Sequence, residues 1–150
     1  MIGSQPGTQE MGWKWPQPPI DQSAISRIEK LWNVQLPRDY VECVKQNHGG
    51  HPDRDCFDLA GRKQAVLNRL LAFTGKTGRI DLFWEIIQDR LPPRVFPFAS
   101  DPAGNYLCFD YRGKTPKVVF WDHERAGRGI VEPTQVCESF TDLLKLLYKP

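Results

Sequence analysis

Apolar residues concentrate in one central stretch of the chain, residues 97–124, and their pattern predicts strands joined by turns. Residues 106–111 and 118–121 are rich in aromatic and β-branched side chains over the length of a strand. Both runs are apolar on both faces, which is typical of central strands covered on each side by other parts of the chain. Residues 101–105 contain a proline that presets φ and a glycine that is free to adopt a positive φ. We therefore expect strand, turn, strand, loop and strand in this stretch.

Four other segments have the spacing of amphipathic helices. The first is expected to begin near Asp21 or Ser23, the second after Pro37, the third at Ile80 and the last after Ser139. Asparagine, glycine or proline residues lie where the first three should end. The positions expected to face the core are Ile25, Ile28, Leu31, Trp32, Tyr40, Val41, Val44, Leu82, Phe83, Ile86, Ile87, Phe140, Leu143, Leu144 and Leu147.

The remaining segments complete the predicted topology. Residues 56–59 alternate like a short strand, whereas the apolar run at 65–73 fits either a helix or a strand. Residues 74–78 are expected to form a turn, and residues 126–133 a loop. The order of elements predicts an α+β fold, a single domain in which helices pack on a mixed or antiparallel sheet.

The beginning of the chain differs in composition from the rest. Residues 1–19 are rich in Gly, Pro and Gln, so we expect a flexible N-terminal arm followed by one domain over residues 20–150. Trp13 and Trp15 are unusual in such a segment, because disordered tails seldom carry paired tryptophans. Both are expected to dock on the domain.

Composition and charge narrow the class of protein. The net charge of +2 is spread evenly, so no segment has the basic excess of a dedicated nucleic-acid binder. No apolar run is long enough to span a bilayer, and the first twenty residues lack the basic start and apolar core of a signal peptide. We therefore expect a cytoplasmic protein without a membrane partner, in which the four cysteines are reduced thiols.

Two stretches suggest ligand chemistry but fit it poorly. Gly-Lys-Thr at residues 75–77 invites a phosphate-loop interpretation, but Leu70 stands where that loop needs its first glycine, so a surface turn is expected. Two cysteines and two histidines between residues 43 and 56 have spacings that match no common closed zinc site. No cofactor and no metal are therefore expected.

Two charged groupings remain open to more than one interpretation. Asp122-His123-Glu124 places an imidazole between two carboxylates, but no nucleophile is tied to it, so a polar cluster or a partner-binding rim is favoured over catalysis. The second grouping is a basic stretch without acidic residues, which fits a solvated face or a contact with phosphate or an acidic partner. Its members are Arg62, Lys63, Arg69, Lys76 and Arg79.

Several short motifs occur in an order that resembles one known family. They are Leu36-Pro37-Arg38-Asp39-Tyr40, Asn47-His48-Gly49-Gly50-His51-Pro52, Val66-Leu67-Asn68-Arg69-Leu70-Leu71, Arg90-Leu91-Pro92, Phe96-Pro97-Phe98-Ala99, Asp101-Pro102-Ala103-Gly104-Asn105-Tyr106-Leu107-Cys108 and Phe120-Trp121-Asp122-His123-Glu124. Together they resemble the SUKH superfamily over about residues 21–148. That superfamily includes fungal regulators of cell-wall glucan synthesis, the bacterial Syd protein and many bacterial toxin-immunity proteins.

The resemblance implies an α+β domain, a strand at residues 65–73, and a protein that binds other proteins and is not an enzyme. The leading hypothesis is an immunity protein that covers the active site of a cognate toxin domain, such as a nuclease or a deaminase. The alternative is a regulatory interaction module of the glucan-synthesis-regulator type without a toxin partner. The chain departs from many relatives at Ala103-Gly104-Asn105, where they have Gly-Gly-Asp or Gly-Gly-Asn. The residues expected to contact the partner are Asp101, Asn105, Asp110, Asp122, His123 and Glu124.

Overall fold

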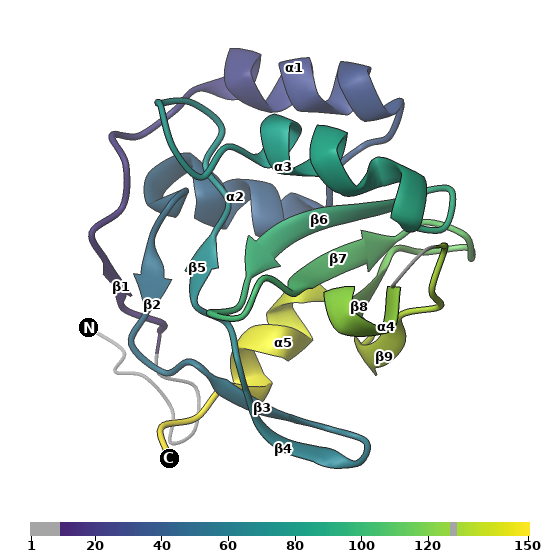
Figure 1. Ribbon diagram of the computed structural model, residues 1–150. Helices are drawn as coiled ribbons and strands as arrows, with labels where there is room; N and C mark the ends of the chain where they lie inside the picture. Colours follow the sequence, from purple (N-terminus) through teal and green to yellow (C-terminus); the bar gives the residue numbers. More distant parts are fainter. Residues whose placement is uncertain (1–9, 127–128) are drawn as a thin grey trace.

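A five-stranded antiparallel sheet lies at the centre of the fold (Figure 1). The computed structural model describes residues 10–126 and 129–150. The strands stand side by side in the order β5 (Arg69–Leu70), β6 (Val95–Ser100), β7 (Tyr106–Asp110), β8 (Lys117–Trp121) and β9 (Thr134–Cys137). The predicted α+β class and the antiparallel sheet are confirmed.

The two central strands, β7 and β8, are covered on both faces, as their apolar composition predicts. Tyr106 and Trp121 are paired in register, and their rings lie 6.1 Å apart on one face of the sheet. Phe109 and Phe120 lie on the opposite face, because side chains alternate along a strand. All four residues are buried, so this hairpin forms the middle of the core.

The helices pack on this sheet in two layers. They are α1 (Gln22–Trp32), α2 (Arg38–Asn47), α3 (Ile80–Ile87) with a 3-10 turn η1 (Gln88–Arg90), the short α4 (His123–Ala126) and α5 (Phe140–Leu146). Phe83 of α3 contacts Tyr106 on one face, while Tyr40 of α2 and Phe140 of α5 pack near Phe109 on the other. Helices therefore separate both faces of the central strands from water.

The predicted helix ends are confirmed by their hydrogen bonds. The Asp21 carboxylate accepts from the Ser23 backbone N–H at the start of α1, and Asn33 ends this helix in the left-handed conformation. The Ser139 hydroxyl accepts from the Asp142 backbone N–H at the start of α5. These ends form as predicted because a capping bond depends only on residues close in sequence.

Three residues that were expected to face the core are instead on the surface. Leu31 is 48% exposed, Leu82 is 44% exposed and Ile86 is 68% exposed. In α3 the buried side consists of Ile80, Phe83 and Ile87, with half-buried Trp84 beside it. Apolar residues occur on almost every side of α3, so their spacing alone could not indicate which side is buried.

Residues 65–73 are extended, and the helical alternative is wrong. The chain first pairs as β4 (Arg62–Val66) with β3 (Cys56–Leu59) in a hairpin that projects from the body of the protein (Figure 1). It then crosses to the central sheet, where β5 pairs with β6. Backbone bonds to two different partners, which are distant in sequence, decide the conformation of this run.

Two further segments differ from the prediction. Strand β9, which pairs with the edge of β8, was not predicted because only two of its four residues are apolar. Asp122-His123-Glu124 follows the end of β8, and residues 123–126 form the helical turn α4, which was not predicted. Residues 127–128 of the predicted loop lie outside the described residues.

Part of the N-terminal segment lies along the domain. Strand β1 (Trp13–Lys14) pairs with β2 (His51–Pro52), and Trp13 packs against the core. Trp15 is 77% exposed and makes an edge contact with the ring of His51. Residues 1–9 of the expected arm lie outside the described residues.

Candidate functional site

The turn between β6 and β7 holds a polar cluster that contains three of the residues expected to contact a partner. The Asp101 carboxylate accepts from the backbone N–H of Asn105 at 2.7 Å and from its side-chain amide at 2.8 Å. The side-chain Oδ1 of Asn105 in turn accepts from the backbone N–H of His123 at 2.9 Å and from its Nδ1 at 2.7 Å. Asp101 and Asn105 are buried, so their polar groups serve the turn.

The cluster holds a half-buried imidazole in one orientation. Because the Asn105 oxygen accepts at Nδ1, this nitrogen of His123 carries a proton, and Nε2 has no hydrogen-bond partner in the part of the chain that the structure describes. The ring lies against Gly104, where an added Cβ would be 3.6 Å from two ring atoms. No serine or cysteine bonds to His123 among the described residues, so the arrangement lacks a paired nucleophile and base.

The other three expected residues do not all join this cluster. Asp122 accepts from the backbone N–H of Glu124, which lies on the exposed side of α4. Asp110 lies at the opposite end of β7 from Asn105, roughly 16 Å away at the usual rise of a strand. The structure therefore gathers Asp122 and Glu124 next to His123 and places Asp110 elsewhere.

Asp110 belongs to an ion-pair network. Arg112 donates to both of its carboxylate oxygens and also pairs with Glu132. Burial works against the charged form of Asp110, but the hydrogen bonds from Arg112 outweigh it and hold the pKa below its usual range. Asp110 is consequently ionised at neutral pH and ties the end of β7 to the segment before β9.

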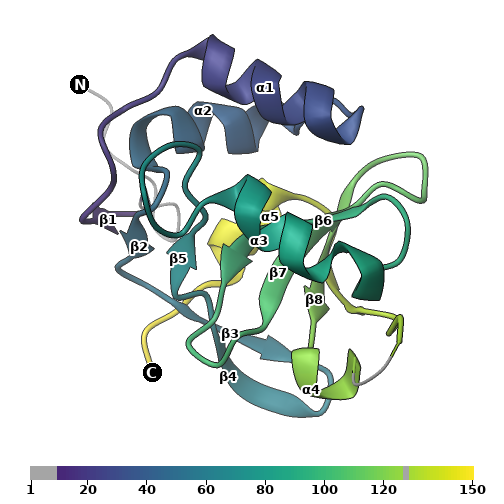
Figure 2. The same cartoon turned by 45° about the horizontal axis from the view of Figure 1, so that its top comes forward.

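A second candidate site, which the sequence analysis missed, lies between α1 and α3. The two helices run side by side on one surface of the protein (Figures 1 and 2). Between them is an open groove of about 560 Å³. It is lined by Arg27, Lys30, Leu31, Asp81, Trp84, Glu85 and Gln88. Leu82 and Ile86 are also exposed on α3 but do not line the groove, and we call the groove and these two residues together the α1–α3 surface.

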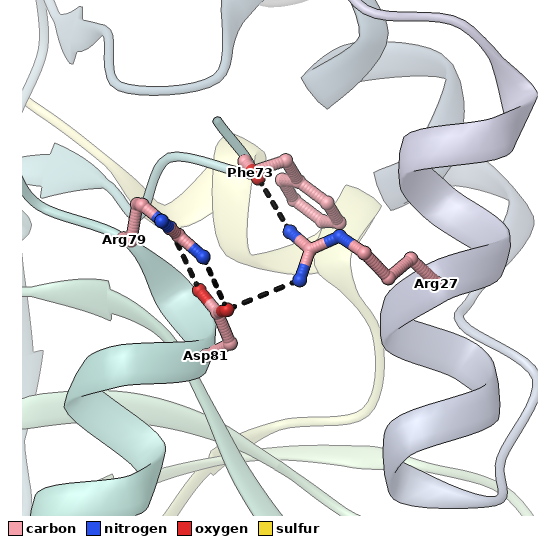
Figure 3. A network of polar contacts seen from close by, with 4 residues as sticks. All are labelled: Arg27, Phe73, Arg79 and Asp81. Atoms are coloured by element: carbon pink, nitrogen blue, oxygen red, sulfur yellow. Dashed lines mark hydrogen bonds and ion pairs between the residues drawn. The ribbon is translucent and has the colours of Figure 1, made fainter. Parts of the chain in front are cut away.

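A polar network holds the two helices together at one end of this surface (Figure 3). Arg79 donates to both Asp81 oxygens at 3.2 and 2.7 Å, and Arg27 donates to the same carboxylate at 3.1 Å. Arg27 also donates to the Phe73 carbonyl at 2.7 Å. Burial alone would raise the pKa of Asp81, but the bonds from the two arginines lower it below its usual range. The network thus fixes α1 against α3.

One signal in the sequence pointed to the α1–α3 surface. Residues 80–87 contain six apolar residues among eight, more than one face of a short helix can bury. The apolar side chains that one face cannot bury must either be covered by other elements of the fold or be exposed on the surface. The groove itself could not be predicted, because α1 and α3 are separated in the sequence by α2 and the strands β2 to β5.

The candidate zinc ligands have structural roles instead. The Nδ1 of buried His48 accepts from the Phe73 backbone N–H at 3.0 Å, and its Nε2 donates to the Pro18 carbonyl at 2.8 Å. All four cysteines are free, and burial raises the pKa of Cys43 and of Cys137 to about 11. Residues 10–126 and 129–150 contain no group of three His, Cys, Asp or Glu side chains that could hold a metal ion.

Among the same residues, no helix is long and apolar enough to cross a membrane.

The polar cluster yields a stability prediction. Asn105→Ala should lower the free energy of unfolding by about 1–3 kcal/mol, because Asp101 and His123 each lose a hydrogen-bond partner. Urea unfolding measures this cost, and the ¹⁵N resonances of the His123 ring report whether its orientation is lost. An unchanged midpoint together with unchanged ring resonances would show that Asn105 does not position His123.

Comparison with known proteins places the chain in a family. Residues 19–146 match the SMI1 / KNR4 family (SUKH-1). The SPbeta prophage-derived uncharacterized protein YokK of Bacillus subtilis (strain 168) is 24% identical over 118 residues, which are 67% of this chain and 60% of YokK. The chain therefore spans less than two thirds of the length of this relative. Because the family match extends over most of the chain and confirms the resemblance carried by the ordered motifs, the protein belongs to the SMI1 / KNR4 family, SUKH-1.

Proposed function

We propose that this chain is a non-enzymatic immunity protein that binds a cognate bacterial toxin domain and blocks it by occlusion. Family membership supports a protein-binding role, because the SUKH superfamily includes many toxin-immunity proteins. The observation that carries the proposal is the α1–α3 surface, where apolar side chains stand exposed around an open groove. An apolar surface bounded by polar residues is typical of a protein–protein interface.

The composition of this surface fits the anatomy of an interface. Leu31 and Trp84 provide an apolar lining in the groove, and Lys30 and Glu85 add charges of both signs. Exposed Leu82 and Ile86 extend the apolar area over another side of α3. Each exposed apolar side chain would contribute up to about 1.5–3 kcal/mol if a partner covered it fully, less the cost of ordering the interface. A rim of mixed charge favours a partner surface of mixed charge, in keeping with the small net charge of the chain.

The polar cluster is proposed as a second contact region. His123, Asp122 and Glu124 would meet the partner directly, while buried Asp101 and Asn105 would hold the imidazole in place. Asp110 would contact the partner at a separate point, since it lies at the other end of β7. The toxin would be a nuclease or deaminase domain acting in the cytoplasm, where we propose that this protein also resides.

The test is neutralisation of a toxin in living cells. The chain is co-expressed with the toxin domain encoded beside its gene, and growth is compared with that of cells expressing the toxin alone. Ile86→Glu should weaken binding at least about 30-fold, which corresponds to a hot-spot contribution of about 2 kcal/mol, because it places a charge on the exposed apolar side of α3. Binding of the purified proteins, measured by calorimetry, gives this factor.

Ile130→Glu is the matched control, since Ile130 is similarly exposed at 59% but lies outside the α1–α3 surface. It should retain both binding and protection. Equal affinity of the two variants would exclude the α1–α3 surface as the interface. Growth arrest despite co-expression of the natural chain would overturn the immunity role itself.

A second candidate function follows from the family that matches. That family is described by its SMI1 / KNR4 members, and the resemblance connects them with regulators of glucan synthesis. A regulatory module of this type would use the same surfaces for partners of its own cell. The absence of a toxin gene beside this one, together with binding of cellular proteins that Ile86→Glu abolishes, would favour it.

A further inference from the structure

Arg69 on β5 is half-buried and forms no ion pair with a carboxylate among residues 10–126 and 129–150. Its guanidinium lies between two glycines: an added Cβ would be 3.0 Å from its Cζ at Gly78 and 3.4 Å from its Nη2 at Gly49. Its Nε is buried and has no hydrogen-bond partner within residues 10–126 and 129–150. Because glycine has no Cβ, both positions leave room for the flat guanidinium group. The described part of the protein does not neutralise the charge of this group.

This lack of a partner is unusual for an arginine. A guanidinium group carries a positive charge and offers five N–H donors, and a buried donor without an acceptor destabilises the fold. All eighteen Asp and Glu residues fall within the described ranges. None of them forms an ion pair with Arg69.

Further hydrogen-bond donors lie in the loop next to Arg69. The loop at residues 74–78 borders it, and its Gly78 has a φ of +68°, a conformation that glycine adopts without strain. Backbone N–H groups of residues 75–78 make no hydrogen bond within the described chain. The same loop carries Lys76, and the Gln17 amide lies against Gly75, where an added Cβ would be 3.2 Å from Gln17 Oε1.

The carboxylate that follows this loop in the sequence is already engaged. Asp81, just beyond the loop, is held by both Arg27 and Arg79 (Figure 3). The segment at residues 73–81 contains this single carboxylate together with Lys76 and Arg79, and Arg27 and Arg69 contact the segment from outside. The local excess of positive charge is part of the basic stretch that the sequence analysis left open.

We propose that Arg69, the Gln17 amide and the loop at residues 74–78 form an oxyanion-binding site for a phosphoryl or carboxylate group. A guanidinium fork matches two oxygens of either group, and successive backbone N–H groups of a glycine-containing turn are a common complement to such an anion. The site lacks the first glycine of a phosphate loop, so it is suited to one oxyanion rather than to a triphosphate. The inference stands independently of the proposed immunity role.

The experiment is an NMR titration of the full chain with inorganic phosphate and, separately, with acetate, at an ionic strength held constant with sodium chloride. The Arg69 Nε–H, the Gln17 amide and the backbone amides of residues 75–78 should shift together and saturate. Saturation with phosphate alone assigns a phosphoryl ligand, and saturation with acetate alone assigns a carboxylate. No concerted shift with either anion would overturn the proposal.

Two variants separate the site from general charge effects. Arg69→Gln should weaken anion binding at least about tenfold, because the fork and the charge are both lost. Lys63→Gln removes the same charge from the exposed β4 strand and should bind like the natural chain. If both variants bound the anion equally weakly, the loss of affinity would follow from net charge alone, and the proposed site would be contradicted. Because the titration of the natural chain observes the Arg69 Nε–H directly, it decides the question even if Arg69→Gln fails to fold.

Discussion

Tyr40→Phe is expected to leave the protein as stable as the natural chain or more stable, whereas Tyr40→Ala is expected to lower the free energy of unfolding by about 3–5 kcal/mol. The two substitutions share one site and differ in what they remove. The first deletes only a hydroxyl, and the second deletes an aromatic ring from the core.

The packing of Tyr40 explains the large loss on truncation. The ring is fully buried on α2, at the point where four other aromatic rings converge from β6, β7, α5 and the segment after β5. Those rings are Phe73, Phe98, Phe109 and Phe140, at centroid distances of 6.3, 5.5, 4.9 and 5.4 Å. Alanine would leave a cavity among elements that cannot all move inward, because they belong to a sheet and two helices.

The surroundings of the Tyr40 hydroxyl explain why Tyr40→Phe is not expected to lower the free energy of unfolding. It is buried, and no hydrogen-bond partner lies near it in the described chain. Burial also raises the pKa of this phenol well above its usual value, so it stays neutral. Removing a buried polar group that lacks a partner removes a cost of burial without breaking a bond.

Urea unfolding of the three proteins measures both effects. The dependence of the unfolding free energy on urea should stay constant, so that shifts in midpoint report stability alone. A loss of more than about 1 kcal/mol in Tyr40→Phe would be the size of a typical hydrogen bond. It would show that the hydroxyl has an acceptor after all.

His48→Phe is expected to lower the free energy of unfolding by about 2–4 kcal/mol, although it exchanges one buried ring for another of similar shape. His48 is fully buried and joins two segments by its ring nitrogens. Nδ1 accepts from the Phe73 N–H, and Nε2 donates to the Pro18 carbonyl. Phenylalanine would leave both backbone groups buried without that partner.

This substitution also has a local consequence. The bond to Pro18 ties the segment before α1 to the end of α2, and the bond to Phe73 ties the start of the loop at residues 74–78 to the same place. Hydrogen exchange of the Phe73 amide should accelerate more than the change in global stability requires. Tyr40→Phe is the internal control, since it removes a buried polar group that has no partner. Similar stabilities of the two variants would contradict the structural role assigned to His48.

Helix caps, central strands and one turn could be predicted from the sequence without the tertiary structure. The helix caps at Asp21 and Ser139 formed as predicted, because a side chain that bonds to a backbone N–H two or three residues away needs no distant partner. Strands β7 and β8 were predicted because a run apolar on both faces has to be central in a sheet. The turn between β6 and β7 followed from its own proline and glycine.

Contacts between residues far apart in the sequence determine which side chains come together in the polar cluster. The cluster of Asp101, Asn105 and His123 forms because β8 returns beside β7, which brings residues 18 positions apart into contact. Asp110 was grouped with them by residue type alone, but it lies at the far end of the same strand. Sequence spacing does not say which end of a strand a later residue will meet.

The sequence by itself determined the α+β class, the central strands, the helix ends and the family, because these depend on local bonding and on the order of short motifs. Only the tertiary structure decided that Leu82 and Ile86 face outward and that residues 65–73 divide between two sheets. It also decided that the Arg69 Nε is buried without a hydrogen-bond partner among the described residues. The physical reason is common to all three. Burial and charge pairing are properties of a position in space, and that position is set by segments far away in the chain.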